Sequence, residues 1–316
     1  RVETSAPYSS GQYNTALGKG ALAGFTTGNY NVAVGYLAGD SITTSGNNTL
    51  VGAQAGSGIT VGSENTFIGY IAGTNVTIGD YNVAVGTQAL TTEDVGRAAT
   101  AIGYQALYSQ NSDSDDENSY NTAVGYQTGF DITTGTSNTL MGAKAGSNIT
   151  TAGDNTVIGY NALGLATTAA SNVAIGGGTM YAVPAAVALS SCVAIGNNAL
   201  RGVGITTAAN YTVAIGVGAL QMNTSGAGNL AIGYNALGVH TTGGSNIAIG
   251  YGAMDKTDAG STSLGSTRNI FMGYDAGGGT WADAASSYNV AIGHYTMDGV
   301  LNAATHNTAL GDYAGK

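Results

Sequence analysis

The feature that most constrains this chain is a five-residue motif, Asn-X1-X2-X3-Gly, which recurs seventeen times between Asn14 and Gly311. Ten of the sixteen intervals between closing glycines are 17 residues long, and the others are one to six residues longer. A constant period with occasional insertions is typical of stacked coils that carry loops on one side. The first five copies have as their asparagines and glycines Asn14 and Gly18, Asn31 and Gly35, Asn48 and Gly52, Asn65 and Gly69, and Asn82 and Gly86.

The composition indicates which kind of coil is stacked. The chain has 52 Gly but only 2 Pro, and 8% of its residues are charged. Glycine is unfavourable inside helices, and the apolar residues cluster in short β-branched runs rather than at helical spacing. We therefore expect an all-β protein: a parallel β-solenoid, or β-roll, of about 17 coils with a 17-residue period. The expected organisation is an N-terminal segment, 1–13, followed by a single continuous repeat domain, 14–316.

The three central motif positions predict a strand that is apolar on both faces. X3 is always Val, Ile, Leu or Met, X1 is always Thr, Val, Ile or Leu, and X2 is never polar, being Ala in twelve copies. Alternate residues of a strand share a face. We expect X1 and X3 to point into the coil interior. The X2 residues would then need a partner beyond their own coil, such as another subunit.

Three further columns of the repeat have predictable roles. Asparagine begins fourteen motifs, and identical asparagines on successive coils can bond to one another as a ladder. The closing glycine indicates either a positive φ angle or a close approach of two backbones. Where X2 is leucine or phenylalanine, glycine stands four positions after the motif glycine, which predicts that the two columns exchange volume, although Val157 with Leu163 departs from the pattern. These later glycines are Gly56, Gly73, Gly146 and Gly277.

Several motif copies resemble known families. Asn31-Val-Ala-Val-Gly35 and Asn246-Ile-Ala-Ile-Gly250 resemble the head repeats of YadA-like trimeric autotransporter adhesins. Asn121-Thr-Ala-Val-Gly-Tyr-Gln127 is similar to repeats of phage tail fibres that carry a cleaved C-terminal chaperone domain. The resemblance implies a left-handed trimeric β-roll that binds host or matrix surfaces and lies outside the cell, on a cell surface or on a virion. The repeat is longer than the adhesin repeat, and the heptad stalk, membrane-anchoring barrel and chaperone domain of these families are absent from the sequence.

The charge balance limits the partners. A formal net charge of −10 disfavours both nucleic acid and anionic membrane surfaces. No apolar run approaches the roughly 20 residues needed to span a bilayer, so we expect no membrane insertion. The single cysteine, Cys192, occupies the asparagine column, which favours a structural substitution over a reactive thiol. We expect no cofactor.

Two groups of residues are candidates for binding. The acidic insertion containing Asp113, Asp115 and Asp116 offers carboxylates to a cation such as calcium, although a solvated loop is the more ordinary interpretation. Aromatic contacts with a cell-surface glycan or protein receptor are possible at Trp281, Tyr126 and Tyr160, and packing between coils, subunits or loops is the alternative.

The sequence favours a structural function over catalysis. The three histidines fall in unrelated repeat positions, and no carboxylate pair or phosphate loop accompanies them, so we expect no enzyme. The first hypothesis is a rigid homotrimeric fibre segment, from a phage tail fibre or a bacterial adhesin, whose loops contact a host. The alternative is a subunit that polymerises head to tail through uncapped solenoid ends. Ice binding is disfavoured, because the threonines at X1 are expected to face inward.

Overall fold

The computed structural model describes residues 10–115, 117–257, 265–281 and 284–315. Its contacts divide the chain into two compact units, 1–154 and 155–316, and each is described by itself. Both units are all-β and are built from parallel solenoid coils, about 17 in the whole chain, as predicted. Among the described residues no helix has the length and apolar character that crossing a bilayer requires. The boundaries expected for one continuous domain stay a prediction.

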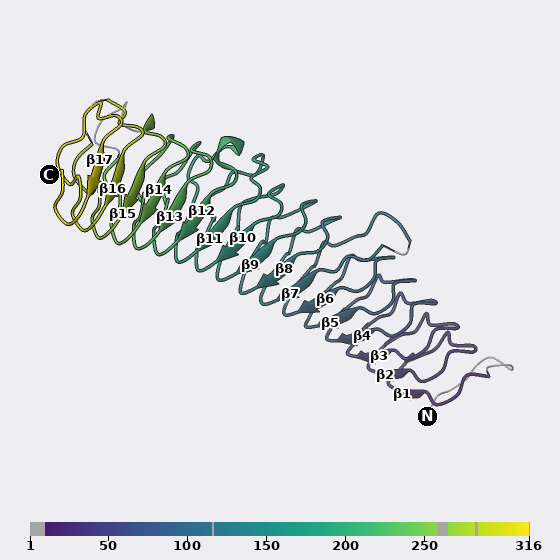
Figure 1. Cartoon of the computed structure of the whole chain (residues 1–316). Helices are drawn as coiled ribbons and strands as arrows, with labels where there is room; N and C mark the ends of the chain where they lie inside the picture. Colours follow the sequence, from purple (N-terminus) through teal and green to yellow (C-terminus); the bar gives the residue numbers. More distant parts are fainter. Residues whose placement is uncertain (1–9, 116, 258–264, 282–283, 316) are drawn as a thin grey trace. The chain divides into compact units, whose positions relative to one another are not determined.

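Every coil contributes one strand, formed by X1, X2 and X3 of its motif (Figure 1). The first unit contains β1 (Thr15–Leu17), β2 (Val32–Val34), β3 (Thr49–Val51), β4 (Thr66–Ile68), β5 (Val83–Val85), β6 (Thr100–Ile102), β7 (Thr122–Val124) and β8 (Thr139–Met141). The second contains β9 (Thr156–Ile158), β10 (Val173–Ile175), β11 (Val193–Ile195), β12 (Val213–Ile215), β13 (Leu230–Ile232), β14 (Ile247–Ile249), β15 (Ile270–Met272), β16 (Val290–Ile292) and β17 (Thr308–Leu310), with a short 3₁₀ turn, η1 (Thr207–Ala209).

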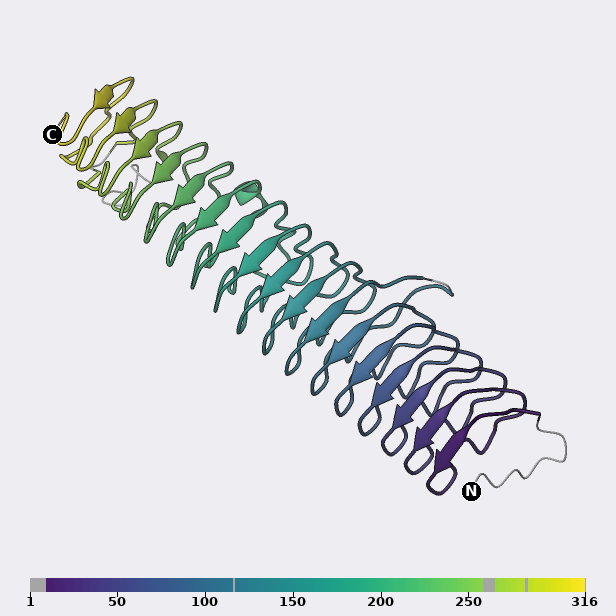
Figure 2. The same cartoon turned by 60° about the horizontal axis from the view of Figure 1, so that its bottom comes forward.

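Within each unit the strands pair in parallel and in motif register. In the first unit, for example, Ala33 lies opposite Leu50, which in turn lies opposite Phe67. The strands of one unit lie side by side, and the turns and insertions complete each circuit behind them (Figure 2). Because the register follows the motif, each repeat position becomes a continuous column of stacked side chains.

The expected assignment of the two strand faces is wrong. The X2 side chains are the buried ones: Ala33, Leu50 and Phe67 have no exposed surface, and only those of the first and last strands, Ala16 and Ala309, are partly exposed. X1 and X3 lie on the opposite, outer face and are half-buried or exposed in every strand. The reason is space, because other columns also project into the narrow coil interior and leave room mainly for alanine beside the strand.

The predicted exchange of volume is confirmed, and it takes place in that interior. A Cβ atom added to Gly56 would lie 2.7 Å from Leu50 Cδ2, and one added to Gly39, in the preceding coil, 2.6 Å from Leu50 Cδ1. Coils with alanine at X2 more often place a buried leucine or methionine at the later position, such as Leu90. A bulky X2 residue therefore requires glycine in its own coil and, for Leu50, in the coil before it.

The motif glycine combines both properties expected of it. Gly69 has φ +139°, a conformation that residues with a side chain rarely adopt. A Cβ atom on Gly69 would lie 2.5 Å from the carbonyl oxygen of Gly86, the motif glycine of the next coil. The glycine column thus permits both the sharp turn after each strand and the close stacking of successive backbones.

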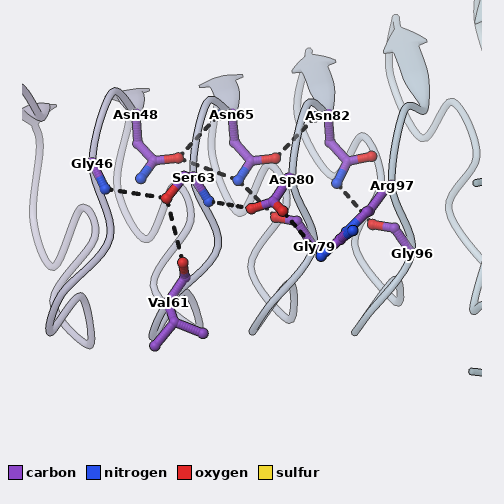
Figure 3. Close-up of polar contacts among 10 residues, drawn as sticks. All are labelled: Gly46, Asn48, Val61, Ser63, Asn65, Gly79, Asp80, Asn82, Gly96 and Arg97. Atoms are coloured by element: carbon purple, nitrogen blue, oxygen red, sulfur yellow. Dashed lines mark hydrogen bonds and ion pairs between the residues drawn. The ribbon is translucent and has the colours of Figure 1, made fainter. Parts of the chain in front are cut away.

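The asparagine ladder is also confirmed (Figure 3). Asn65 Nδ2 donates to Asn48 Oδ1 at 3.2 Å and to the Gly79 carbonyl at 2.8 Å. The Asn82 backbone N–H donates to Asn65 Oδ1 at 2.9 Å. A buried asparagine such as Asn65 therefore accepts a hydrogen bond from a backbone N–H of the following coil and donates one to the carbonyl of a turn. Without the asparagine side chain these two buried backbone groups would have no partner.

A polar pair compensates where the ladder is interrupted by Ala99. Gln110 Oε1 accepts the hydrogen bond of Asn121 Nδ2 at 3.0 Å, while Gln110 Nε2 donates to Glu93 Oε2 at 2.9 Å. Glu93 Oε1 also accepts the Gly96 backbone N–H at 2.8 Å. The side chains of Glu93 and Gln110 lie in a column that is apolar in most coils. The coil interior therefore becomes polar where the asparagine is missing.

Candidate interaction surfaces

The outer strand face, formed by the X1 and X3 side chains, is a regular and largely apolar surface in each unit. Within the stack the exposed fractions are 39% at Ile68, 49% at Met141 and 40% at Ile292, and the terminal strands are more exposed still. The two ranks of side chains lie about 7 Å apart along the strands, and neighbouring coils are about 4.8 Å apart. Over the nine strands β9 to β17 these spacings give an area of about 300 Å², at the lower end of the range for the largest apolar patch of a typical monomer.

The outer strand face is most uniformly apolar in the second unit. From β10 to β16 both ranks consist of aliphatic side chains and methionine, without a threonine. The X1 residues of these strands are Val173, Val193, Val213, Leu230, Ile247, Ile270 and Val290. In the first unit threonine replaces valine at X1 in six of the eight strands, which adds hydroxyl groups to one rank. An extensive outward apolar face of this kind usually marks a binding surface.

The X1 threonines, which were expected to face inward, face outward, as Thr49 and Thr66 show. The expected inward orientation therefore does not exclude ice binding. The outward threonines are nevertheless interrupted by Val32 and Val83 in the first unit and are absent from most of the second. An aliphatic surface favours burial against another apolar surface over contact with ordered water.

The tyrosines that follow the motif glycine form a second surface, and most of their rings are stacked on one another. Tyr234, Tyr251 and Tyr274 stack with centroid distances of 4.9 and 5.1 Å. Tyr126 likewise stacks on Tyr104 at 5.4 Å. Rings stacked in this way cover each other's faces and leave mainly edges and hydroxyl groups in solvent. The packing alternative therefore accounts for Tyr126, although its side chain remains half exposed.

Tyr160 differs from the stacked tyrosines. It is 64% exposed, and the equivalent position in the next coil is Gly177, which offers no ring to stack on. A planar ring with an accessible face can pack against the apolar face of a sugar or an aliphatic side chain. Among the three aromatic residues singled out from the sequence, Tyr160 keeps the geometry of a contact residue.

Trp281 is not an exposed contact, and its burial agrees with the packing alternative. Its side chain is fully buried, its Nε1 donates to the Gly277 carbonyl at 2.8 Å, and its ring centroid lies 5.6 Å from that of Phe271. It lies opposite Leu301 of the next coil, which is also buried.

The acidic insertion has the character of a solvated loop in the part that the structure describes. Asp113 and Asp115 are exposed, and the Asp113 backbone N–H donates to Glu117 Oε2 at 3.0 Å. Asp116 lies outside the described residues. No three metal-ligating side chains come together within the ranges that are described. Calcium binding here stays a prediction without a geometric site.

Two buried side chains of reactive residue types, a thiol and an imidazole, have structural partners. Cys192 Sγ lies 3.6 Å from the Ala209 carbonyl, and burial raises the pKa of its thiol. His240 is fully buried, with Nε2 2.7 Å from the Gly243 carbonyl and Nδ1 3.0 Å from Thr257 Oγ1. A carbonyl only accepts, so Nε2 carries the proton and Nδ1 accepts from the threonine. Burial lowers the pKa of His240 to about 4, so the ring is neutral near pH 7.

The sequence reasoning missed this interior polar column. Seven residues after the motif glycine most coils have an aliphatic side chain, but Glu93, Gln110, Asn223 and His240 occupy the same position and are buried. Aligning the repeats at that column would have revealed them. Asn223 and His240 are equivalent in successive coils, since the Asn223 Nδ2 donates to the Gly226 carbonyl at 3.0 Å, as His240 does to Gly243.

Comparisons with known proteins do not assign the chain to a family. No family model matches it, and neither a curated protein nor a solved structure matches it.

Proposed function

We propose that this chain is a structural and adhesive fibre segment, from a phage tail fibre or a bacterial surface adhesin, that assembles as a homotrimer. The observation that carries the proposal is the outward apolar face of β10 to β16, where X1 and X3 are aliphatic or methionine in every strand. Burying these two ranks against the same ranks of other copies would remove them from water. In this proposal the apolar interface between subunits is formed by the X1 and X3 side chains and not by the X2 side chains.

The energetic case follows from the area of this face. About 300 Å² in the second unit alone, at ~25 cal/mol per Å², corresponds to roughly 7 kcal/mol of burial free energy per chain before the entropy of association is subtracted. The resemblance of the motif to trimeric adhesin and tail-fibre repeats favours three copies. In such an assembly the repeats supply a rigid scaffold, and exposed loops and corners contact a host glycan or protein.

The test measures the mass of the purified chain by sedimentation equilibrium and compares two substitutions. Ile232→Asp places a charge in the middle of the outer strand face, where the coil interior is untouched. Val203→Asp makes the same kind of change at a 55% exposed loop position. We expect three chains for the wild type and for Val203→Asp, and monomers for Ile232→Asp with an unchanged far-UV circular dichroism spectrum.

Each other outcome points to a definite alternative. A folded wild-type monomer at micromolar concentration would refute the trimer. Species of indefinite length seen by electron microscopy would support head-to-tail polymerisation instead. Thermal hysteresis of a monomeric wild type, lost in Ile232→Asp, would show that the outer strand face binds ice.

A further inference from the structure

A small cavity opens at one corner of the second unit, away from its strands. It has a volume of about 190 Å³ and spans three successive coils. Its walls are formed by Gln221, Met222, Asn235, Gly238, Val239 and Asp255. None of these residues belongs to the outer strand face or to the stacked tyrosines, so the cavity is a feature separate from the proposed interface between subunits.

A single glycine creates the cavity. Gln221, Gly238 and Asp255 occupy the same repeat position, the fifth residue after the motif glycine, in three consecutive coils. Gly238 has no side chain, so the two flanking side chains stand on either side of a gap two coil spacings, or about 10 Å, wide. Its backbone does not have the positive φ of the motif glycines, so the conformation itself does not require glycine there.

One polar atom in the walls lacks a hydrogen-bond partner among the described residues. Asp255 Oδ1 is buried and accepts no hydrogen bond from the described residues. Desolvation by burial raises the pKa of Asp255, while Lys256 lowers it and Asp275 raises it further. A buried carboxylate oxygen without a partner costs free energy that a bound donor would recover. Asn235 and Gln221 add two amides, each able to donate and to accept.

The chemistry of the walls selects the class of ligand. A carboxylate and two amides can bind adjacent hydroxyl groups, and Met222 and Val239 offer an apolar wall to carbon-bound hydrogens. A neutral pyranose ring presents both kinds of surface and has the size of a cavity of this volume. Acidic sugars are disfavoured by the carboxylates nearby and by the net charge of −10.

We propose that the notch formed by Gln221, Asn235, Gly238 and Asp255 binds one neutral hexopyranose residue of a surface glycan. The inference rests on the proposed adhesive function and names the ligand class for it. A hydroxyl group donates to Asp255 Oδ1, a neighbouring hydroxyl group exchanges hydrogen bonds with the Asn235 amide, and the ring lies in the gap above Gly238.

The experiment titrates the whole chain with the methyl pyranosides of glucose, galactose, mannose and N-acetylglucosamine. Saturation-transfer NMR identifies the sugar that binds, and calorimetry gives its dissociation constant, expected near ~1 mM for a single ring. Asp255→Asn is expected to weaken binding tenfold or more, and Gly238→Gln to abolish it by filling the gap. Circular dichroism verifies that both variants keep the β-fold.

Asp40→Asn is the matched control. Asp40 occupies the same repeat position in the first unit, and its Oδ1 is likewise buried and has no partner among the residues that the structure describes. Binding should be unchanged in Asp40→Asn. Equal weakening in both aspartate variants, or no saturation of the wild type by any of the four sugars, would overturn the proposal. Calcium binding that depends on Asp255, without sugar binding, would make the notch a cation site. None of these results alters the sedimentation test of the trimer.

Discussion

The asparagine ladder gives the sharpest test of what holds the coils together. Replacing Asn65 by alanine removes the acceptor of the Asn82 N–H and the donor to the Gly79 carbonyl, both buried. The Asn48 Oδ1 remains satisfied, because the Asn65 backbone N–H still donates to it at 3.0 Å. Each orphaned buried group costs about 1–3 kcal/mol, so the two together destabilise the unit by roughly 2–6 kcal/mol.

The matched comparison is Asn14→Ala. Asn14 makes the equivalent bonds to the Asn31 N–H and the Gly28 carbonyl but is only part-buried, so water can replace the side chain. We expect that substitution to cost below ~1 kcal/mol. Guanidinium denaturation at one protein concentration measures both variants, and hydrogen exchange reports the loss of protection at the Asn82 amide. Free energies of unfolding for the two variants within about 0.5 kcal/mol of each other would refute the ladder as a major source of stability.

Three further predictions test the interior and the turns. His240 has a folded pKa of about 4 against an ordinary 6.5, so its contribution to stability is complete above pH 6.5 and is lost as the pH falls toward 4. Between pH 7 and pH 5 the wild type should lose about 2 kcal/mol more than His240→Asn in denaturation experiments, and parallel pH profiles would contradict this. Gly69→Ala should destabilise by about 3 kcal/mol or more, whereas Gly177→Ala, which meets only an asparagine side chain, should lie within ~1 kcal/mol of wild type by thermal melting. Gln110→Ala should lower stability by about 1–3 kcal/mol by leaving Asn121 Nδ2 and Glu93 short of a partner; an unchanged denaturation midpoint would show that the compensating pair is dispensable.

Motif periodicity predicted most of the fold, because the residue type conserved in each repeat position indicates the backbone conformation or hydrogen bond needed there. The asparagine column predicted the ladder, and the glycine column predicted the positive φ and the close backbone approach later found at Gly69. The candidate contacts were less predictable. The sequence leaves Trp281 open between surface contact and loop packing, because a lone tryptophan in a glycine-rich insertion has no periodic neighbours to indicate burial. The notch at Asp255 depends on an absent side chain at Gly238 and could not be recognised before the coils were aligned in space.

What the sequence by itself determined was that short parallel strands stack in register, since the recurring 17-residue spacing, the apolar X2 and X3 positions and the threonine or aliphatic residue at X1 leave few other arrangements. Only the tertiary structure decided which strand face is inside. Alternation along a strand separates two faces but does not say which one the rest of the coil closes over. The exchange of volume between Leu50 and Gly56 contained the answer, because two columns can exchange volume only within one shared interior.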